Sequence, residues 1–206
     1  MQLDTPAKKT SYSLGLDTGI NLLRLPVDID LAALLRGIED AYQRRDPAIS
    51  REEFTQVMEE FQRKLQEAQE SNRGRIREAN QKEGLRFCET NGKKPGVVTT
   101  PSGLQYEPLQ EGTGAAPSAT SAVRVHYRGT FIDGQEFDSS YARGEPAEFP
   151  LNRVIRGWTE GIQKMRVGGK ARLVIPEQLA YGEGGTGPIP PGATLVFEVE
   201  LLGIIG

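Results

Sequence analysis

Apolar residues in the first half of the chain recur every three or four positions, which is the period of an amphipathic α-helix. Three stretches follow this period, and their apolar members are Tyr12, Leu16, Ile20 and Leu23; Leu31, Leu34, Leu35, Ile38 and Tyr42; and Phe54, Met58, Phe61, Leu65 and Ala68. Side chains that can accept the unpaired amide protons of a first helical turn precede each stretch. These are Thr10 or Ser11, then Asp30, and then Ser50, which forms a capping box with Glu53. The pattern therefore predicts three helices.

The third helix outlasts its apolar stripe. The stripe fades near residue 69, but the composition stays polar and helix-favouring as far as Asn91 and Gly92, a natural stop. Gly74 and Gly84 each weaken such a helix by about 1 kcal/mol relative to alanine. A helix of about 40 residues would be about 60 Å long. We expect so long a polar helix to bridge two bodies through solvent.

The second half follows the period of a β-strand instead. Apolar and polar residues alternate in several short runs, and Asp133-Gly134 is a hairpin turn signal. The runs cover residues 104–106, 122–128, 136–137, 171–175 and 194–201. One short helix fits, from about Trp158 to Lys164. The glycines and prolines of residues 92–101 indicate a hinge.

Composition changes at the same place. Residues 1–95 contain 32 charged side chains and 6 glycines, whereas residues 96–206 contain 21 and 18. This contrast favours helices followed by strands and turns. We therefore expect an α+β protein with an all-helical region and long connecting helix at 1–95. A small domain of antiparallel strands around one short helix would follow at 96–206.

Several chemistries are excluded by the residue inventory. The single Cys88 cannot form an internal disulfide or a CxxC site, and the single His126 cannot build a histidine metal cluster. A formal net charge of −3 does not suit a nucleic-acid-binding protein. No apolar run approaches the roughly 20 residues that span a bilayer. Residues Met1–Asp4 lack the features of a secretory leader, so either the protein is cytoplasmic or a leader has been removed.

Two local motifs do not support catalysis by themselves. Gly182–Gly187 has the GxGxxG spacing of a dinucleotide-binding turn, but Pro188 and two further prolines prevent the helix that this turn requires. Ser139 lacks the flanking glycines of a nucleophile elbow. His126 lies in an alternating strand, where a structural role is expected.

Large aromatic residues in the second half come from widely separated segments. They are Tyr127, Phe137, Phe149, Trp158, Tyr181 and Phe197. Val154 and Ile155 directly precede Gly157-Trp158, and Asp138 follows Phe137. Such residues could form an ordinary core, or an apolar pocket with a few placed polar groups, which is the usual form of a small-ligand site. The pattern leaves both interpretations open.

These segments resemble the FKBP family of peptidyl-prolyl cis–trans isomerases over roughly residues 100–203. The resemblance is carried by five segments: residues 125–129 (VHYRG), 133–140 (DGQEFDSS), 154–158 (VIRGW), 179–182 (LAYG), and 189–191 (IPP) with 194–201 (TLVFEVEL). Residues of about 9–92 resemble the dimerising N-terminal region of Mip-type bacterial members, through Tyr12–Gly15 (YSLG) and the long third helix.

The resemblance implies a half-barrel, in which a twisted antiparallel sheet wraps one short helix and the site lies between them. Trp158 would be the pocket floor, and the Ile155 amide and Tyr181 hydroxyl would donate to substrate or macrolide carbonyls. The implied catalytic residues are Asp138, Tyr181, Trp158 and Phe137. The implied substrate-binding residues are Tyr127, Phe149, Val154, Ile155, Phe197, Arg143 and Ile189. Ala147 stands where some relatives carry phenylalanine, and the loop at 183–187 is short and glycine-rich, so the rim differs from theirs.

The same resemblance implies a prolyl isomerase that assists protein folding and needs no cofactor or metal. Gly15 and Gly19 lie four apart on the first helix, where another backbone could approach. We expect a V-shaped homodimer with holdase-like chaperone activity, in which two pockets on long arms enclose a cleft. Its partners would be proline-containing unfolded chains and macrolides of the tacrolimus and rapamycin type. The relatives suggest the periplasm or cell envelope, with the cytoplasm as the alternative. The rival interpretations are a binding module without catalysis and a purely structural helical dimeriser.

Overall fold

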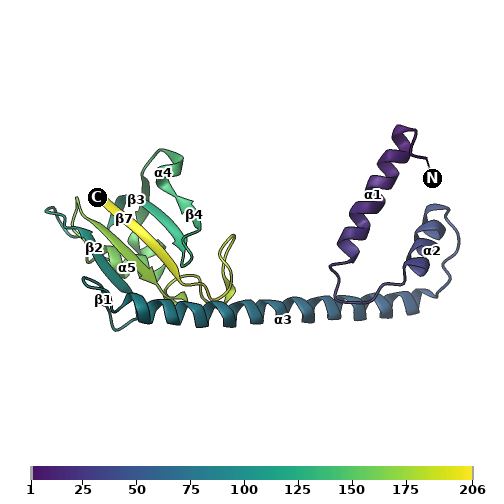
Figure 1. Ribbon diagram of the computed structural model, residues 1–206, viewed down its shortest axis with the longest axis horizontal. Helices are drawn as coiled ribbons and strands as arrows, with labels where there is room; N and C mark the ends of the chain where they lie inside the picture. The colour runs from purple at the N-terminus through teal and green to yellow at the C-terminus, as the bar shows by residue number, and fades with distance from the viewer. Residues whose placement is uncertain (1, 206) are drawn as a thin grey trace. The chain divides into compact units, whose positions relative to one another are not determined.

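The computed structural model describes residues 2–205. The chain divides into two compact units, one ending at residue 72 and the other starting at residue 73. The first unit is helical and the second is built on a β-sheet, with one long helix running through both parts of the chain (Figure 1). The predicted α+β class is therefore confirmed.

Helices α1 (Pro6–Leu22) and α2 (Leu31–Tyr42) precede the long α3 (Arg51–Asn91). Asp30 and Ser50 cap α2 and α3 as predicted, because their side chains accept from the amides of Ala33 at 2.9 Å and Glu53 at 3.1 Å. The predicted cap of α1 is wrong. The helix begins about five residues earlier, where Thr5 accepts from the amide of Lys8 and proline occupies the first turn. Proline suits that turn because its φ angle is already helical and its missing N–H would be unpaired anyway.

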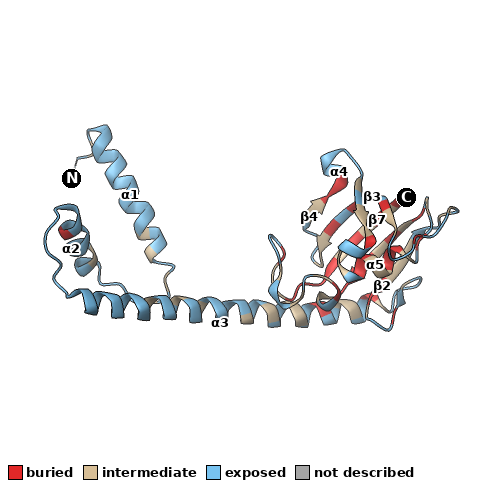
Figure 2. Cartoon of the chain, turned by 180° about the vertical axis from the view of Figure 1, so that it is seen from behind, coloured by how far each residue is buried: buried red, intermediate tan, exposed pale blue. Residues whose placement is uncertain are grey.

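The first unit leaves its apolar side chains uncovered. Between residues 2 and 72, Asp40 is the only buried residue that the structure describes, and Arg36 and Arg45 pair with its carboxylate. Figure 2 shows α1, α2 and the first part of α3 almost entirely as exposed surface. Large apolar side chains of these helices, such as Leu16 and Leu35, are more than half exposed.

The second unit contains one antiparallel sheet of seven strands, in the order β1-β2-β6-β7-β3-β4, with β5 paired to β3. The strands are β1 (Val98–Thr99), β2 (Gln105–Gln110), β3 (Ala122–Phe131), β4 (Glu136–Ser139), β5 (Ala147–Pro150), β6 (Lys170–Ile175) and β7 (Leu195–Ile205). A short helix, α4 (Ser140–Arg143), follows β4. Single turns lie at η1 (Leu151–Arg153), η2 (Glu177–Leu179) and η3 (Gly182–Gly184).

Helix α5 (Arg156–Ile162) packs on the sheet and forms the core with it. It is the predicted short helix, beginning and ending two residues earlier than expected. Gly157 and Gly161 bring it close to β6, because a Cβ there would lie 2.4 Å from Ile175 and 2.7 Å from Leu173. This close approach places Trp158 against the strands. The buried apolar residues lie almost wholly in this sheet-and-helix unit (Figure 2).

The end of α3 packs against the sheet unit. Asn91 donates to the Gln105 side chain at 2.9 Å, and Gln105 in turn donates to the Cys88 carbonyl at 2.7 Å. Asn91 is buried at this contact, and Gly84, earlier on α3, is buried against Thr194. The boundary predicted near residue 95 and the hinge at 92–101 stay predictions, whereas the compact sheet unit starts at residue 73 and includes the end of α3.

Candidate active site

A cavity of about 300 Å³ opens between α5 and the sheet. Strands β3, β4, β5 and β7, helix α5 with the turn before it, and the segment after η2 all contribute side chains. The lining residues are Tyr127, Phe137, Asp138, Phe149, Arg153, Val154, Ile155, Trp158, Tyr181 and Phe197. Residues far apart in sequence thus form one largely aromatic concavity, which is the usual form of a small-ligand site.

Trp158 lies at the centre of this aromatic set and is only 4% exposed. The rings of Tyr127, Phe149 and Phe197 meet its indole nearly at right angles, with centroid separations of 5.1, 5.5 and 5.3 Å. Edge-to-face contacts of this kind hold aromatic rings in defined orientations. The indole Nε1 is buried without a hydrogen-bond partner among the described residues. The floor of the cavity is therefore an indole framed by aromatic rings in defined orientations.

A hydrogen-bonded triad borders the cavity. The Tyr127 hydroxyl donates to Asp138 Oδ2 at 2.5 Å, and Arg143 donates to the Tyr127 hydroxyl at 2.8 Å. Arg143 also pairs with Asp138 Oδ1, and its guanidinium lies 5.5 Å from the centre of the Tyr127 ring. This arrangement fixes the Tyr127 ring, which contacts Trp158, through two charged neighbours.

The triad keeps Asp138 ionised. Burial would raise the pKa of this carboxyl, but hydrogen bonds from Tyr127 and Arg143, the positive charge of Arg143 and the Ser139 amide outweigh burial and lower the pKa. Burial raises the pKa of the Tyr127 hydroxyl, and its bond to the Asp138 carboxylate raises it further. At neutral pH Asp138 is therefore an ionised carboxylate paired with the Arg143 guanidinium, and the Tyr127 phenol beside it is neutral.

Tyr181 reaches the cavity from the other side. It follows η2, is 40% exposed and lies at the start of the glycine-rich loop. Burial raises the pKa of its hydroxyl, and the Asp138 charge adds to the effect, so the hydroxyl stays protonated. The Ile155 amide, just before α5, has no hydrogen-bond acceptor among the described residues. Both groups are available as donors to a bound carbonyl.

The structure brings together nine of the eleven predicted site residues. Arg143 does not line the cavity, but it contacts Asp138 and Tyr127, which do. Ile189 is 6% exposed and packs in the core instead. Sequence reasoning missed Arg153, since a single arginine before Val154 carries no pattern of its own.

His126 lies outside the cavity lining. Its Nδ1 is 3.0 Å from the Ser140 hydroxyl, and its ring stacks on Tyr141 with centroids 4.6 Å apart. Ser140 also accepts from the Tyr127 amide at 2.8 Å. These contacts give His126 the structural role predicted for it.

Residues 2–205 contain neither a candidate metal cluster nor a membrane-spanning helix. No group of three His, Cys, Asp or Glu side chains in residues 2–205 is placed to hold a metal ion. None of the helices described combines the length and apolar character needed to cross a membrane.

The chain matches two known sequence families. Residues 114–202 match the family described as FKBP-type peptidyl-prolyl cis-trans isomerase, and residues 7–107 match the domain amino-terminal to it. The chain is 47% identical over 204 residues to an FKBP-type 22 kDa peptidyl-prolyl cis-trans isomerase of Escherichia coli, with 98% of this chain and 97% of the relative covered. It is 44% identical to FkpA of Aeromonas hydrophila, covering 96% of this chain and 76% of that protein.

Solved structures agree with the sequence matches. The crystal structure of FkpA from Escherichia coli superposes with a TM-score of 0.80 at 38% identity and covers 98% of this chain and 97% of that one. A peptidyl-prolyl cis-trans isomerase from Pseudomonas syringae superposes with a TM-score of 0.59 at 42% identity, covering 63% of this chain and 96% of that one. The fold, the aromatic cavity and these relatives agree, and the chain belongs to the FKBP family as a peptidyl-prolyl cis–trans isomerase.

Proposed function

We propose that the bond before proline rotates in the cavity floored by Trp158, and that the clients are unfolded or partly folded chains. The observation that carries the proposal is the set of aromatic rings held edge-on to one indole beside an ionised carboxylate. A proline ring fits such an apolar floor. Asp138, Tyr181, Trp158 and Phe137 would act on the reacting bond. Tyr127, Phe149, Val154, Ile155 and Phe197 would bind the substrate, with Arg143 acting through the triad.

The chemistry needs no covalent intermediate. Rotation about an amide bond crosses a barrier of about 18–20 kcal/mol, because resonance makes the planar form more stable. Water supports the charge-separated planar amide, so a cavity that excludes water favours the twisted form. The Ile155 amide and the Tyr181 hydroxyl would hold the flanking carbonyls. Lowering the barrier by about 4–7 kcal/mol would accelerate the reaction by about 10³ to 10⁵.

The test of this site is the turnover of a proline tetrapeptide by Tyr181→Phe and Trp158→Ala variants. Both should lose kcat/KM while retaining the far-UV circular dichroism of the parent. A macrolide of the tacrolimus type should inhibit the parent in competition with the peptide. Unchanged turnover by both folded variants would refute the assignment of the cavity.

We further propose that the helical unit forms a homodimer. A groove of about 1130 Å³ follows α1 and the segment after it, and Tyr12, Gly15, Leu16, Gly19 and Ile20 are among its lining residues. Apolar side chains of this extent are seldom left in water by a stable protein. A second copy of the same helices would cover them, and Gly15 and Gly19 would allow a close approach.

Two substitutions on α1 separate dimerisation from general helix damage. Leu16 lines the groove, whereas Leu14 is 65% exposed and does not. Leu16→Asp should give a monomer in light scattering, and Leu14→Asp should leave the dimer intact. Dimers in both variants would contradict the proposed interface.

A dimer would also account for chaperone action. Two tethered cavities raise the effective concentration of the second for a client already held by the first. The monomeric Leu16→Asp variant should therefore turn over tetrapeptides like the parent but catalyse proline-limited refolding of a whole protein less well. Equal refolding catalysis by monomer and dimer would remove the proposed chaperone contribution.

We place the protein in the bacterial cell envelope. A protein called outer membrane protein MIP, from Legionella longbeachae, is 38% identical over 98% of this chain. The single cysteine also suits oxidising surroundings. Fractionation of the native cells should find the protein in the envelope, and recovery from the cytoplasm would contradict the proposal.

A further inference from the structure

The loop that follows Tyr181 forms a closed flap, defined here as residues 182–192. The Gly192 amide donates to the Gly182 carbonyl at 3.1 Å and closes its base. Thr186 and Ile189 exchange two further backbone hydrogen bonds, at 2.9 and 2.8 Å. Because Tyr181 is the residue immediately before this closed base, the position of its ring depends on the position of the flap.

One face of α3 holds the flap through three side chains. Arg77 pairs with Glu183 at 2.8 Å, and Arg73 donates to the Gly184 carbonyl at 3.0 Å. Asn80 donates to the Pro191 carbonyl at 2.7 Å. Positions 73, 77 and 80 are spaced by four and three, so they share one side of the helix. The helix thereby contacts the flap near both of its ends, at residues 183–184 and at Pro191.

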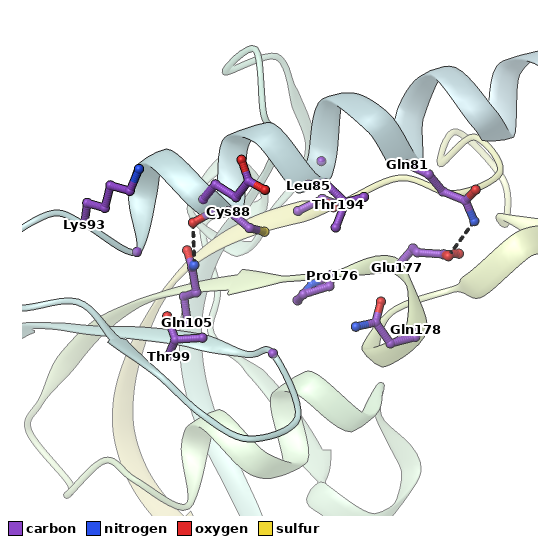
Figure 3. Close-up of a pocket in the computed structure, with 14 residues that line it drawn as sticks. Gln81, Leu85, Cys88, Lys93, Thr99, Gln105, Pro176, Glu177, Gln178 and Thr194 are labelled. Atoms are coloured by element: carbon purple, nitrogen blue, oxygen red, sulfur yellow. Dashed lines mark hydrogen bonds between the residues drawn. The ribbon is translucent and has the colours of Figure 1, made fainter.

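Close packing sets where this face of α3 can lie. A Cβ at Gly84 would lie 2.2 Å from Thr194 Oγ1, and a Cβ at Gly192 would lie 2.8 Å from the Arg77 carbonyl oxygen. Gln81 donates to Glu177 of η2 at 2.7 Å, on the segment that leads into Tyr181 (Figure 3). The helix therefore has little freedom to shift along the flap without losing these contacts.

We propose that Arg77 and Asn80 are positioning residues for the isomerase site, which act on substrate binding by holding the flap and, through it, Tyr181. The proposal rests on the proposed role of Tyr181 in the cavity. The residues touch no substrate. They determine what fraction of the molecules holds Tyr181 in place before a proline chain arrives.

The expected effect falls on KM. When only a fraction of a protein is competent to bind, the apparent dissociation constant rises by the inverse of that fraction. If loss of the contacts that Arg77 and Asn80 make with the flap lowers the fraction of competent molecules to between one-third and one-tenth, KM rises about three- to tenfold. The value of kcat stays within about twofold, because bound substrate itself selects the closed flap.

The test measures kcat and KM on a proline tetrapeptide with full-length variants. Arg77→Glu places two like charges together, and Asn80→Ala removes the bond to Pro191, so each should raise KM. The double variant Arg77→Glu, Glu183→Arg restores an ion pair of opposite sense and should recover the parent KM. Arg75→Glu makes the same charge change on the same helix at an exposed position and should leave KM unchanged. Circular dichroism and Trp158 emission check that each variant has kept its fold and pocket floor.

Coupling to Tyr181 separates this proposal from the one on which it rests. In a Tyr181→Phe background, Arg77→Glu should raise KM less than it does in the parent. If Tyr181→Phe alone behaves like the parent, the role of Tyr181 fails. If Tyr181→Phe is impaired while Arg77→Glu and Asn80→Ala keep the parent KM, the positioning role of Arg77 and Asn80 is refuted. Failure of the charge-swapped variant to recover KM, or an equal rise with Arg75→Glu, would also overturn it.

Discussion

Replacing Asp138 by leucine tests the triad that borders the cavity. Asp138 accepts hydrogen bonds from the Tyr127 hydroxyl and from Arg143, and leucine accepts neither. Tyr127 would keep its contact with Arg143, but in that contact the phenol oxygen is the acceptor. The variant therefore removes the hydrogen bond that the Tyr127 hydroxyl donates and weakens the positioning of the ring that packs edge-on against Trp158.

The magnitude follows from the two lost hydrogen bonds. The Asp138 side chain is 40% exposed, so each bond contributes only about 1 kcal/mol net. If both contributions orient groups in the transition state, about 2 kcal/mol is lost, which is about thirtyfold in kcat/KM. We expect a decrease of about ten- to thirtyfold. The free energy of unfolding should change by less, because leucine removes the cost of partly burying a carboxylate.

Asparagine separates the hydrogen bond from the charge. Asp138→Asn keeps an acceptor for Tyr127 but removes the negative charge next to Arg143, so its kcat/KM should fall between those of the parent and the leucine variant. Glu148→Leu is the matched control, since Glu148 of β5 forms an ion pair at 2.7 Å with Arg124 of β3 and does not line the cavity. A protease-free isomerisation assay is required, so that a loosened variant is not simply digested.

The pH dependence has a defined sign. The pKa of Asp138 lies below its ordinary value of 3.8, so the parent should keep constant kcat/KM from pH 8 to about pH 5 as far as this group is concerned. The stability that Asp138 contributes is fully present above pH 3.8 and is lost as the pH falls through the lowered pKa. The difference in thermal stability between the parent and Asp138→Asn should therefore shrink only in strong acid. A leucine variant with kcat/KM within twofold of the parent would refute the reasoning about the triad.

Three further predictions concern aromatic residues, two of them at the cavity and one, Tyr141, outside its lining. The sole tryptophan, Trp158, should change its emission when a proline ligand binds, and unchanged emission at saturation would place the ligand elsewhere. Gly129→Ala should lower both thermal stability and kcat/KM, because its Cβ would lie 2.8 Å from the Phe137 ring; parent-like values would contradict this. Burial and the Glu200 carboxylate raise the pKa of Tyr141 to about 12, so ultraviolet titration should show one fewer late-titrating tyrosine in Tyr141→Phe. The stability that Tyr141 gives the parent over this variant should be lost as the pH rises from 10 to 12.

The sequence determined the elements whose signals are local. The three- and four-residue spacing of apolar side chains predicted α2 and α3, and Asp30 and Ser50 marked where they begin. Alternation predicted the central strands, and the short helix expected from about Trp158 to Lys164 was within two residues of its observed bounds. These features depend on neighbours within about one helical turn or strand pair, which a linear pattern records. The start of α1 was missed because its first turn carries no apolar stripe.

Which distant residues contact one another depends on the tertiary structure. Nothing local showed that Arg143 would bind the Tyr127 hydroxyl, that Arg153 would border the cavity, or that Ile189 would pack in the core. Gly84 illustrates the difference most clearly. In the sequence it only weakens a helix, but in the fold it lets α3 close on Thr194 and hold the flap. Contacts between residues about a hundred positions apart depend on how whole elements pack, and packing selects them by shape and charge in three dimensions, which the period of a single segment does not encode.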